Sequence, residues 1–142
     1  MSFQNILVVC IGNICRSPMA EALLKQACQD KNIFSAGIEG MVDYPADPMA
    51  IACMQELGLD ISNHVARRLD AAMMIRADLV LVMTTQQLKI VEERWSFAKG
   101  KVFRLGHWRD KNIADPYQKG MSEFVLAKDL IQEGVNDWVL RF

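Results

Sequence analysis

Histidines, net charge and long apolar runs are all scarce in this sequence of 142 residues. It has only two histidines, His64 and His107, and its four cysteines form no CxxC pair. A zinc site is therefore poorly supported, and we expect a protein that needs no metal and no other cofactor. The 16 Lys and Arg nearly balance the 17 Asp and Glu, which leaves a formal net charge of -1. This balance offers no general attraction for nucleic acid or anionic membranes, so an anionic ligand must be bound by a local site.

No apolar run is long enough to cross a membrane, and the run Ile6-Leu7-Val8-Val9 lacks the basic flank of a signal peptide. We therefore expect a cytoplasmic protein without membrane insertion, whose cysteines are thiols. The length and the hydrophobic fraction of 51% fit one domain over residues 1–142.

Short apolar runs alternate with amphipathic stretches along the chain. The predicted strands are 5–9, 33–36, 78–83 and 102–105. The predicted helices are 19–29, Asp47-Pro48 to Gly58, Thr84 to Trp95 with Thr84 as the cap, and 124–139. This alternation predicts an α/β fold, a single-domain small four-stranded parallel sheet with helices on both faces. Such sheets bind ligands at the carboxyl ends of strands, near a switch in strand order, and Cys10 follows the first strand directly.

The segment most informative about function runs from Cys10 to Pro18, with the sequence Cys-Ile-Gly-Asn-Ile-Cys-Arg-Ser-Pro. Its Cys-x5-Arg spacing alone is weak evidence, because four Cys and eight Arg in 142 residues give this spacing by chance about 0.2 times. Its setting between a strand and a helix is stronger evidence, since the backbone N–H groups of such a loop can point into one concavity that binds phosphate. Glycine and asparagine in the loop tolerate the unusual backbone angles that this needs. The predicted phosphate-binding residues are Ile11, Gly12, Asn13, Ile14, Cys15 and Arg16.

Cys10 and Arg16 together suggest nucleophilic attack on a phosphate ester. A helix N-terminus and a nearby cation favour the thiolate, which is a strong nucleophile. The planar guanidinium of Arg16 can grip two phosphate oxygens at once. Ser17 can donate a hydrogen bond to the sulfur and help the thiolate to leave later. The alternative is that Cys10 is a small buried hydrophobic residue at the end of a strand.

This reaction needs a general acid for the leaving oxygen, and two Asp-Pro pairs are candidates. Asp47-Pro48 leads straight into an apolar helical pattern, so helix capping explains it. Asp115-Pro116 lies in a polar connection before the last helix, where the extended geometry of a residue before proline can project the aspartate from a loop. From the residues alone, a solvated loop aspartate explains Asp115 equally well.

In combination, these segments resemble the bacterial branch of the low-molecular-weight protein tyrosine phosphatase family. The resemblance covers nearly the whole chain, through the segments 10–18, 35–37, 64–69, 106–108 and 115–117. It implies that Cys10 forms a phosphocysteine intermediate and that Arg16 and the loop amides stabilise the transition state. Asp115 would protonate the phenolic oxygen and then activate the water that hydrolyses the intermediate.

The same resemblance assigns supporting roles to other positions. The residues expected to hold the loop are Asn13, Ser17, Ser35 and His64. The residues expected to form the pocket walls are Ile11, Met41, Tyr44 and Tyr117. Met41 stands where some relatives have tryptophan, and Gln118 stands where many eukaryotic members have a second tyrosine.

The other cysteines and the second histidine have simpler explanations. Cys15 is explained equally well by a reversible disulfide with Cys10 and by packing. Cys28 and Cys53 fall on apolar helix faces and are expected in the core, and His107 is expected to be structural.

The implied function is hydrolysis of phosphotyrosine, and the implied partner is a phosphotyrosine protein. Prokaryotic members often accompany tyrosine kinases that control capsule or exopolysaccharide export, so such a kinase is the implied substrate. An arsenate reductase of the same fold is the nearest rival, but the thioredoxin-linked relatives carry further cysteines after the third strand, and residues 82–99 contain none. A non-catalytic phosphotyrosine-binding module would gain nothing from a reactive thiolate. The sequence makes no prediction of the oligomeric state or of peptide preference.

Overall fold

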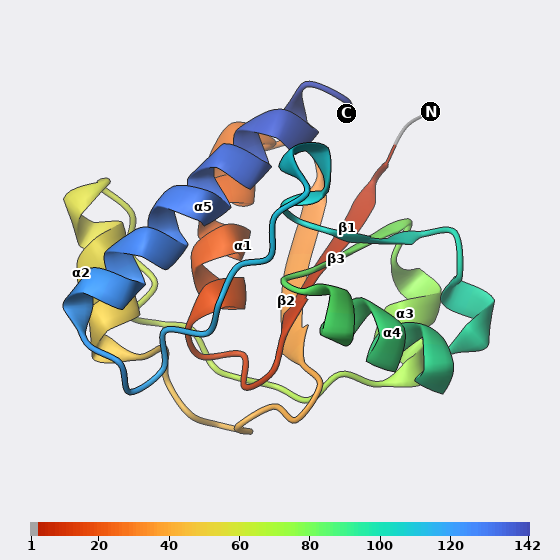
Figure 1. The fold of residues 1–142 in the computed structure, drawn as a ribbon, viewed down its shortest axis with the longest axis horizontal. Helices are drawn as coiled ribbons and strands as arrows, with labels where there is room; N and C mark the ends of the chain where they lie inside the picture. The colour runs from red at the N-terminus through yellow and green to blue at the C-terminus, as the bar shows by residue number, and fades with distance from the viewer. Residues whose placement is uncertain (1–2) are drawn as a thin grey trace.

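Four parallel strands form the centre of the computed structural model, which describes residues 3–142 (Figure 1). The strands are β1 (Asn5–Cys10), β2 (Asn32–Gly37), β3 (Leu79–Val82) and β4 (Val102–Arg104). Their order in the sheet is β2-β1-β3-β4, and every neighbouring pair is parallel. A parallel sheet covered on both faces needs nearly continuous apolar strands, and the Leu-Val-Leu-Val sequence of β3 is buried at every position. The prediction of a small four-stranded parallel sheet is confirmed.

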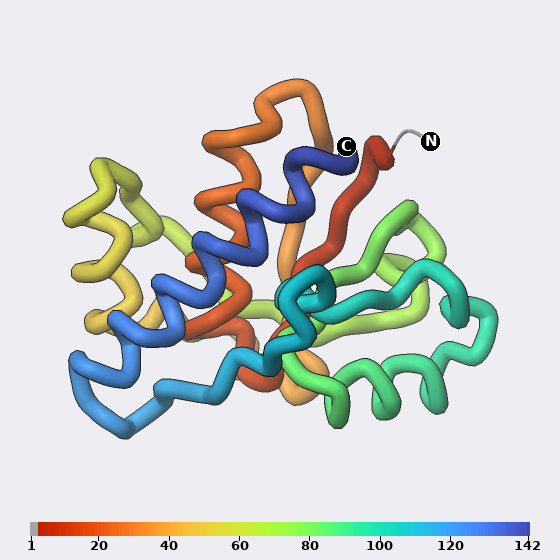
Figure 2. The backbone as a smooth tube through the Cα atoms, turned by 45° about the horizontal axis from the view of Figure 1, so that its top comes forward, coloured from red at the N-terminus to blue at the C-terminus, as the bar shows by residue number. Residues whose placement is uncertain are grey.

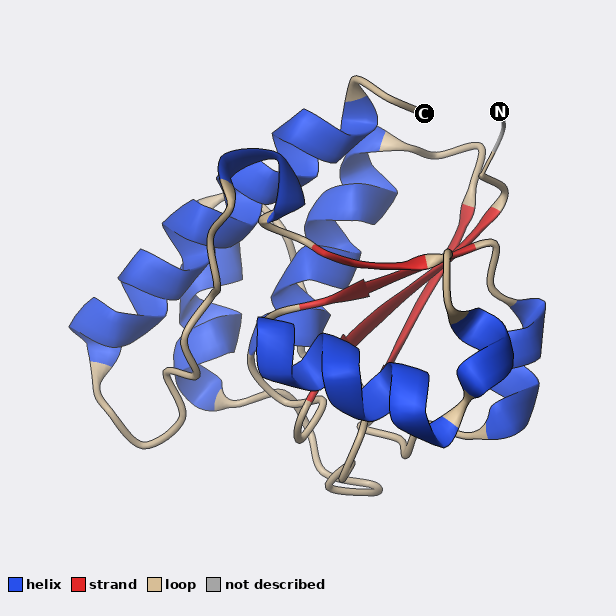
Figure 3. Cartoon of the chain, turned by 45° about the vertical axis from the view of Figure 1, so that its right-hand side comes forward, coloured by secondary structure: helices blue, strands red, loops and turns tan. Residues whose placement is uncertain are grey.

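Helices cover both faces of this sheet, as predicted (Figure 3). One face carries α1 (Arg16–Ala27), α2 (Pro48–Glu56) and α5 (Met121–Val139). The other face carries α3 (Ala71–Arg76) and α4 (Thr85–Arg94). Two short 3-10 helices, η1 (Ser96–Ala98) and η2 (His107–Arg109), flank β4. Because neighbouring side chains of a strand point to opposite faces, β1 contributes Ile6 and Val8 to one core cluster and Leu7 and Val9 to the other.

The helix starts follow the capping residues predicted from the sequence. The side chain of Asp47 accepts a hydrogen bond from Met49 N at 2.9 Å, with Pro48 as the first helical residue of α2. Thr84 caps α4 in the same way, accepting from Gln87 N at 3.1 Å. Capping therefore accounts for Asp47, the weaker of the two candidate acids.

Two features differ from the predicted elements. Helix α1 begins at Arg16 and not at residue 19, because its first turn is built from the end of the Cys10–Pro18 segment. Helix α3 was not predicted, since six residues are too few to show a helical period. Its start carries a local signal nonetheless, because the side chain of Asp70 accepts a hydrogen bond from Met73 N.

The strand order places a topological switch point at the carboxyl end of β1. The chain passes from β1 to β2 on one side and later returns to β3 on the other side. Parallel sheets of this kind leave a crevice at that point, and Cys10 is the last residue of β1. Figure 2 shows the two ends of the described chain close together, and the rings of Phe3 and Phe142 are 6.0 Å apart. Within residues 3–142, no helix combines the length and the apolar character needed to span a membrane.

Candidate active site

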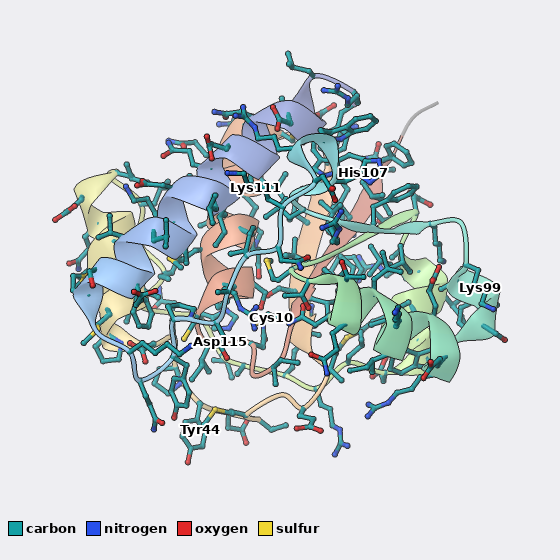
Figure 4. All side chains as sticks on the ribbon, viewed as in Figure 1. Cys10, Tyr44, Lys99, His107, Lys111 and Asp115 are labelled. Carbon is teal, nitrogen blue, oxygen red and sulfur yellow. The ribbon has the colours of Figure 1, made fainter. Side chains whose placement is uncertain are left out.

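A cavity of about 220 Å³ opens at the carboxyl end of β1, where Figure 4 labels Cys10 and Asp115 close together. Its lining residues are Cys10, Ile11, Gly12, Ile14, Cys15, Arg16, Glu39, Met41, Asp115 and Tyr117. The end of β1, the loop after it and the start of α1 therefore supply most of the wall. Asn13, in the middle of this loop, has a φ of 61°, the left-handed region that asparagine tolerates better than most residues.

The sulfur of Cys10 lies at the base of this loop and is surrounded by hydrogen-bond donors. Cys10 is 2% exposed, and its Sγ lies 2.9 Å from the hydroxyl oxygen of Ser17. The backbone N–H of Asn13 donates to the same sulfur at 3.3 Å. Both groups stabilise a sulfur that carries negative charge. The structure thus brings Cys10 and Ser17 together as the sequence predicted.

The side chain of Asn13 connects the loop to β2 and to the segment after α2. Its Nδ2 donates to the hydroxyls of Ser17 at 2.7 Å and Ser35 at 3.0 Å, and its Oδ1 accepts from Arg67 N at 3.0 Å. Its backbone oxygen lies 2.7 Å from Nε2 of His64. A carbonyl oxygen can only accept, so the His64 ring donates from Nε2. All four residues expected to hold the loop therefore belong to one network.

Two members of this network were missed in the sequence. The hydroxyl of Ser35 donates to Oε1 of Glu21, whose Oε2 pairs with Lys25 at 2.6 Å. Arg67 donates from Nε to the carbonyl of Ser35 at 3.0 Å. One signal was available for Glu21, because it lies four residues after Ser17 and so shares the same face of α1.

Arg16 is buried with part of its guanidinium unused. The side chain is 3% exposed, and one terminal nitrogen donates to the backbone oxygen of Ile113 at 2.8 Å. The other terminal nitrogen lies 3.7 Å from Oδ2 of Asp115. Nε of Arg16 has no hydrogen-bond partner among the described residues, although it is buried. A buried donor without a partner costs free energy, and two oxygens of a bound phosphate would satisfy Nε and the second terminal nitrogen together.

Asp115 lies at the mouth of the cavity. Its side chain is 46% exposed, and Oδ1 accepts a hydrogen bond from Tyr117 N at 3.1 Å. The other carboxylate oxygen faces Arg16, which places the carboxyl group at the cavity that Arg16 and Cys10 also line. The solvated loop aspartate, the alternative explanation, accounts for its exposure but not for its position at the cavity.

The segment before Asp115 is tied to the sheet by contacts that the sequence did not predict. Oδ1 of Asn112 accepts from the first helical N–H of α4, that of Thr85, at 3.0 Å and from Arg104 at 3.0 Å. The next residue, Ile113, is fully buried, and its N–H donates to Met83 O at 3.0 Å. These contacts hold the carbonyl that orients Arg16.

Three of the four predicted wall residues line the cavity, namely Ile11, Met41 and Tyr117. Tyr44 does not line it; a turn closed by the bond from Tyr44 N to Met41 O carries it to the outer edge of the molecule, where it is 55% exposed (Figure 4). Glu39 lines the cavity and was missed by the sequence reasoning.

All four cysteines are free thiols and are buried. Cys28 and Cys53 belong to the core cluster, as predicted. Cys15 lines the cavity beside Cys10, and burial, followed by the negative charge of Asp47, raises the pKa of its thiol well above the ordinary value. Cys15 is therefore protonated at neutral pH, and its disulfide with Cys10 stays a prediction.

His107 and the possible metal ligands lie outside the cavity. The ring of His107 makes edge contacts with Phe103 at 5.3 Å and Trp108 at 4.8 Å. Its aromatic contacts support the structural role expected for it. Within residues 3–142, His, Cys, Asp and Glu side chains form no group of three that could hold a metal ion.

Replacing Asn13 with alanine should destabilise the protein by about 2–4 kcal/mol, because the change removes three hydrogen bonds, two of them buried, and places alanine at a positive φ. Urea unfolding followed by circular dichroism measures this loss. The matched control is Asn136→Ala on the exposed face of α5, which should change the free energy of unfolding by less than about 0.5 kcal/mol. Equal stability of the two variants would contradict the importance of the network.

Comparison with known proteins agrees with this geometry. A family model described as low molecular weight phosphotyrosine protein phosphatase matches residues 5–141. The chain is 56% identical to the low molecular weight protein-tyrosine-phosphatase Ptp of Acinetobacter johnsonii, over 97% of each chain. It is 37% identical to the low molecular weight protein-tyrosine-phosphatase Wzb of Escherichia coli K12, over 96% of this chain and 93% of that protein. The solved structure of Vibrio vulnificus Wzb in complex with benzylphosphonate matches with a TM-score of 0.96 at 36% identity, covering 99% of this chain and 100% of that one. This chain belongs to the low molecular weight phosphotyrosine protein phosphatase family.

Proposed function

We propose that this protein hydrolyses phosphotyrosine through a phosphocysteine intermediate. The proposal rests on the observation that Cys10, Arg16 and Asp115 line one cavity, and that Nε of Arg16 has no hydrogen-bond partner among the described residues. The family supports the same chemistry. Benzylphosphonate, the ligand of the Vibrio vulnificus relative, joins a phenyl ring to a phosphonate and so has the shape of the proposed substrate.

In the first step, the thiolate of Cys10 attacks phosphorus opposite the ester oxygen. The Sγ–P bond forms while the P–O bond to the phenol breaks, and Asp115 gives its proton to the leaving oxygen. Arg16 and the backbone N–H groups of the loop stabilise the charge on the other phosphate oxygens.

In the second step, water attacks phosphorus and releases inorganic phosphate. Asp115, now a carboxylate, takes a proton from that water, and the Sγ–P bond breaks to restore the thiolate. The hydroxyl of Ser17, 2.9 Å from the sulfur, stabilises the departing thiolate. Asn13, Ser35 and His64 keep the loop in position for both steps.

The substrate is a phosphotyrosine side chain of a protein, and the cavity walls fit its phenyl ring. Ile11, Met41 and Tyr117 supply apolar surface around the entrance. A phosphoserine is too short to bring its phosphate to Cys10 past these walls. By family resemblance, the partner is a tyrosine kinase of capsule or exopolysaccharide production, and the reaction takes place in the cytoplasm.

The decisive assay compares p-nitrophenyl phosphate hydrolysis with arsenate reduction. We expect phosphate release at a kcat on the order of 1–100 per second. Excess EDTA should not change the rate, because the nucleophile and the acid are both side chains of this chain. Arsenate, offered with a thioredoxin or glutathione system, should not be reduced, since the segment 82–99 provides no further cysteine. Arsenate reduction without phosphatase activity would reject the proposal in favour of the rival.

A further inference from the structure

Three charged side chains line the cavity, and the proposed reaction uses two of them. Arg16 binds phosphate and Asp115 transfers protons, which leaves Glu39. Glu39 is exposed, and its carboxylate makes no hydrogen bond or ion pair with any residue in the described part of the chain. An unpaired carboxylate at the mouth of a site for an anionic substrate repels that substrate. Glu39 therefore needs an explanation other than phosphate binding.

The backbone that carries Glu39 is packed closely against the loop after β1. Its N–H donates to the carbonyl of Ile11 at 3.0 Å, which ties it directly to the phosphate-binding loop. The glycines on either side are packed closely, because a Cβ at Gly37 would lie 2.4 Å from Ile11 O and one at Gly40 would lie 2.3 Å from Arg67 O. Side chains cannot be added at these two positions without moving the backbone. Glu39 thus presents a charge from a rigid segment, as a recognition residue does.

The position of Glu39 brings it next to the residues that flank a bound phosphotyrosine. With the ring between the apolar walls, the peptide must cross the cavity mouth, where Glu39 and Asp115 both lie. Arg67 and Arg68, in the segment that pairs with Gly37, do not line this cavity, and Arg67 donates from Nε to Ser35 O. Arg16, the one cationic side chain among the lining residues, is buried and lies beside Asp115, so the exposed carboxylate of Glu39 keeps a negative charge at the mouth.

We propose that Glu39 is a specificity-determining residue that favours phosphotyrosine sites with a lysine or arginine beside the phosphotyrosine and disfavours acidic neighbours. This inference rests on the proposed phosphatase function. A long basic side chain can reach the carboxylate from the peptide, whereas an acidic one meets like charge. Because the pair is exposed to solvent, we expect a preference of about 3- to 10-fold in kcat/KM.

The test uses three synthetic phosphotyrosine peptides that differ only in the two residues flanking the phosphotyrosine, which are both lysine, both alanine or both glutamate. For the wild type, kcat/KM should fall in that order. In Glu39→Gln the lysine-to-glutamate ratio should shrink to about a third or less of its wild-type value, and Glu39→Lys should reverse the order. The ratio is taken within each variant, so a general change in activity cancels. Glu123→Gln, a matched change at an exposed position of α5, should keep the wild-type ratio.

Varying the salt concentration shows whether the preference comes from the charge or from the size of the flanking residues. Raising the ionic strength from about 0.01 M to about 1 M shortens the screening length roughly tenfold, so the wild-type preference should disappear. An equal ratio in the wild type and Glu39→Gln, or a wild type with no preference, would overturn the inference and leave the phosphatase function intact. Failure to hydrolyse any of the three peptides would reject the proposed function, and the inference with it.

Discussion

Cys10→Ser will lower kcat toward p-nitrophenyl phosphate by about 10⁴-fold or more, because a serine hydroxyl is a far weaker nucleophile at neutral pH than a thiolate. The environment of Cys10 supports an anionic sulfur through Asn13 N–H and the Ser17 hydroxyl, and neither donor can turn an alcohol into an alkoxide. Phosphate binding should survive, since Arg16 and the loop amides are unchanged. Its Kd, measured by calorimetry with inorganic phosphate, should stay within about tenfold of the wild-type value.

The same substitution at a cysteine outside the cavity provides the control. Cys28 is buried 18 positions later, just after the end of α1, and does not line the site. Cys28→Ser should therefore keep kcat within about threefold of the wild type under conditions where the variant is folded. A Cys10→Ser variant with undiminished turnover would reject the phosphocysteine mechanism. Loss of both turnover and phosphate binding would mean that Cys10 is needed to maintain the structure of the loop.

The sheet was predictable because its strands are short apolar runs that can be recognised from their own residues. β1 and β3 read as fully buried strands in the sequence, and both are central in the sheet. Capping residues gave the starts of α2 and α4 for a similar reason, since a cap acts within three residues of itself. Helix α3 was missed because its stability comes from burying Met74 against the sheet and not from a repeating pattern.

The site was predictable to the extent that it is local. Cys10 to Ser17 form one continuous segment, so strand, loop and helix could be inferred together. Asn112, in contrast, acts on the site through the N-terminus of α4 and the side chain of Arg104, and no pattern in the sequence links these three positions. Glu39 lines the cavity because β2 pairs with β1 in parallel, so the residues that follow the two strands lie at the same edge of the sheet.

Tyr44 is the opposite case, because the resemblance predicted it in the cavity wall and it does not line the cavity. The resemblance placed both Met41 and Tyr44 in the pocket walls, but only Met41 lines the cavity, and a turn lies between the two residues. The direction in which a side chain leaves a loop depends on backbone angles that the sequence does not specify here. Asp43, inside this turn, has a φ of 70°, which changes the course of the chain just before Tyr44.

Asp115→Asn will slow the hydrolysis of phenyl phosphate by about 10²- to 10³-fold and that of p-nitrophenyl phosphate by much less, because asparagine cannot give a proton to the leaving oxygen. Phenols of ordinary basicity, such as tyrosine with a pKa of about 10, leave poorly as anions and depend on that proton. A nitrophenolate spreads its charge over the nitro group and leaves with little help. A series of aryl phosphates should therefore show a steeper fall of log kcat with leaving-group pKa in the variant than in the wild type.

Asp43→Asn is the matched control for this series. It removes the same charge from an exposed aspartate near the site that does not line the cavity, and asparagine tolerates its positive φ. The dependence on leaving group should stay that of the wild type. A loss in Asp115→Asn that is equal for every leaving group would mean that Asp115 acts through its ion pair with Arg16, 3.7 Å away, and would remove its role as the acid. The steeper dependence, found only in Asp115→Asn, requires a proton to move from this carboxyl group to the departing phenol.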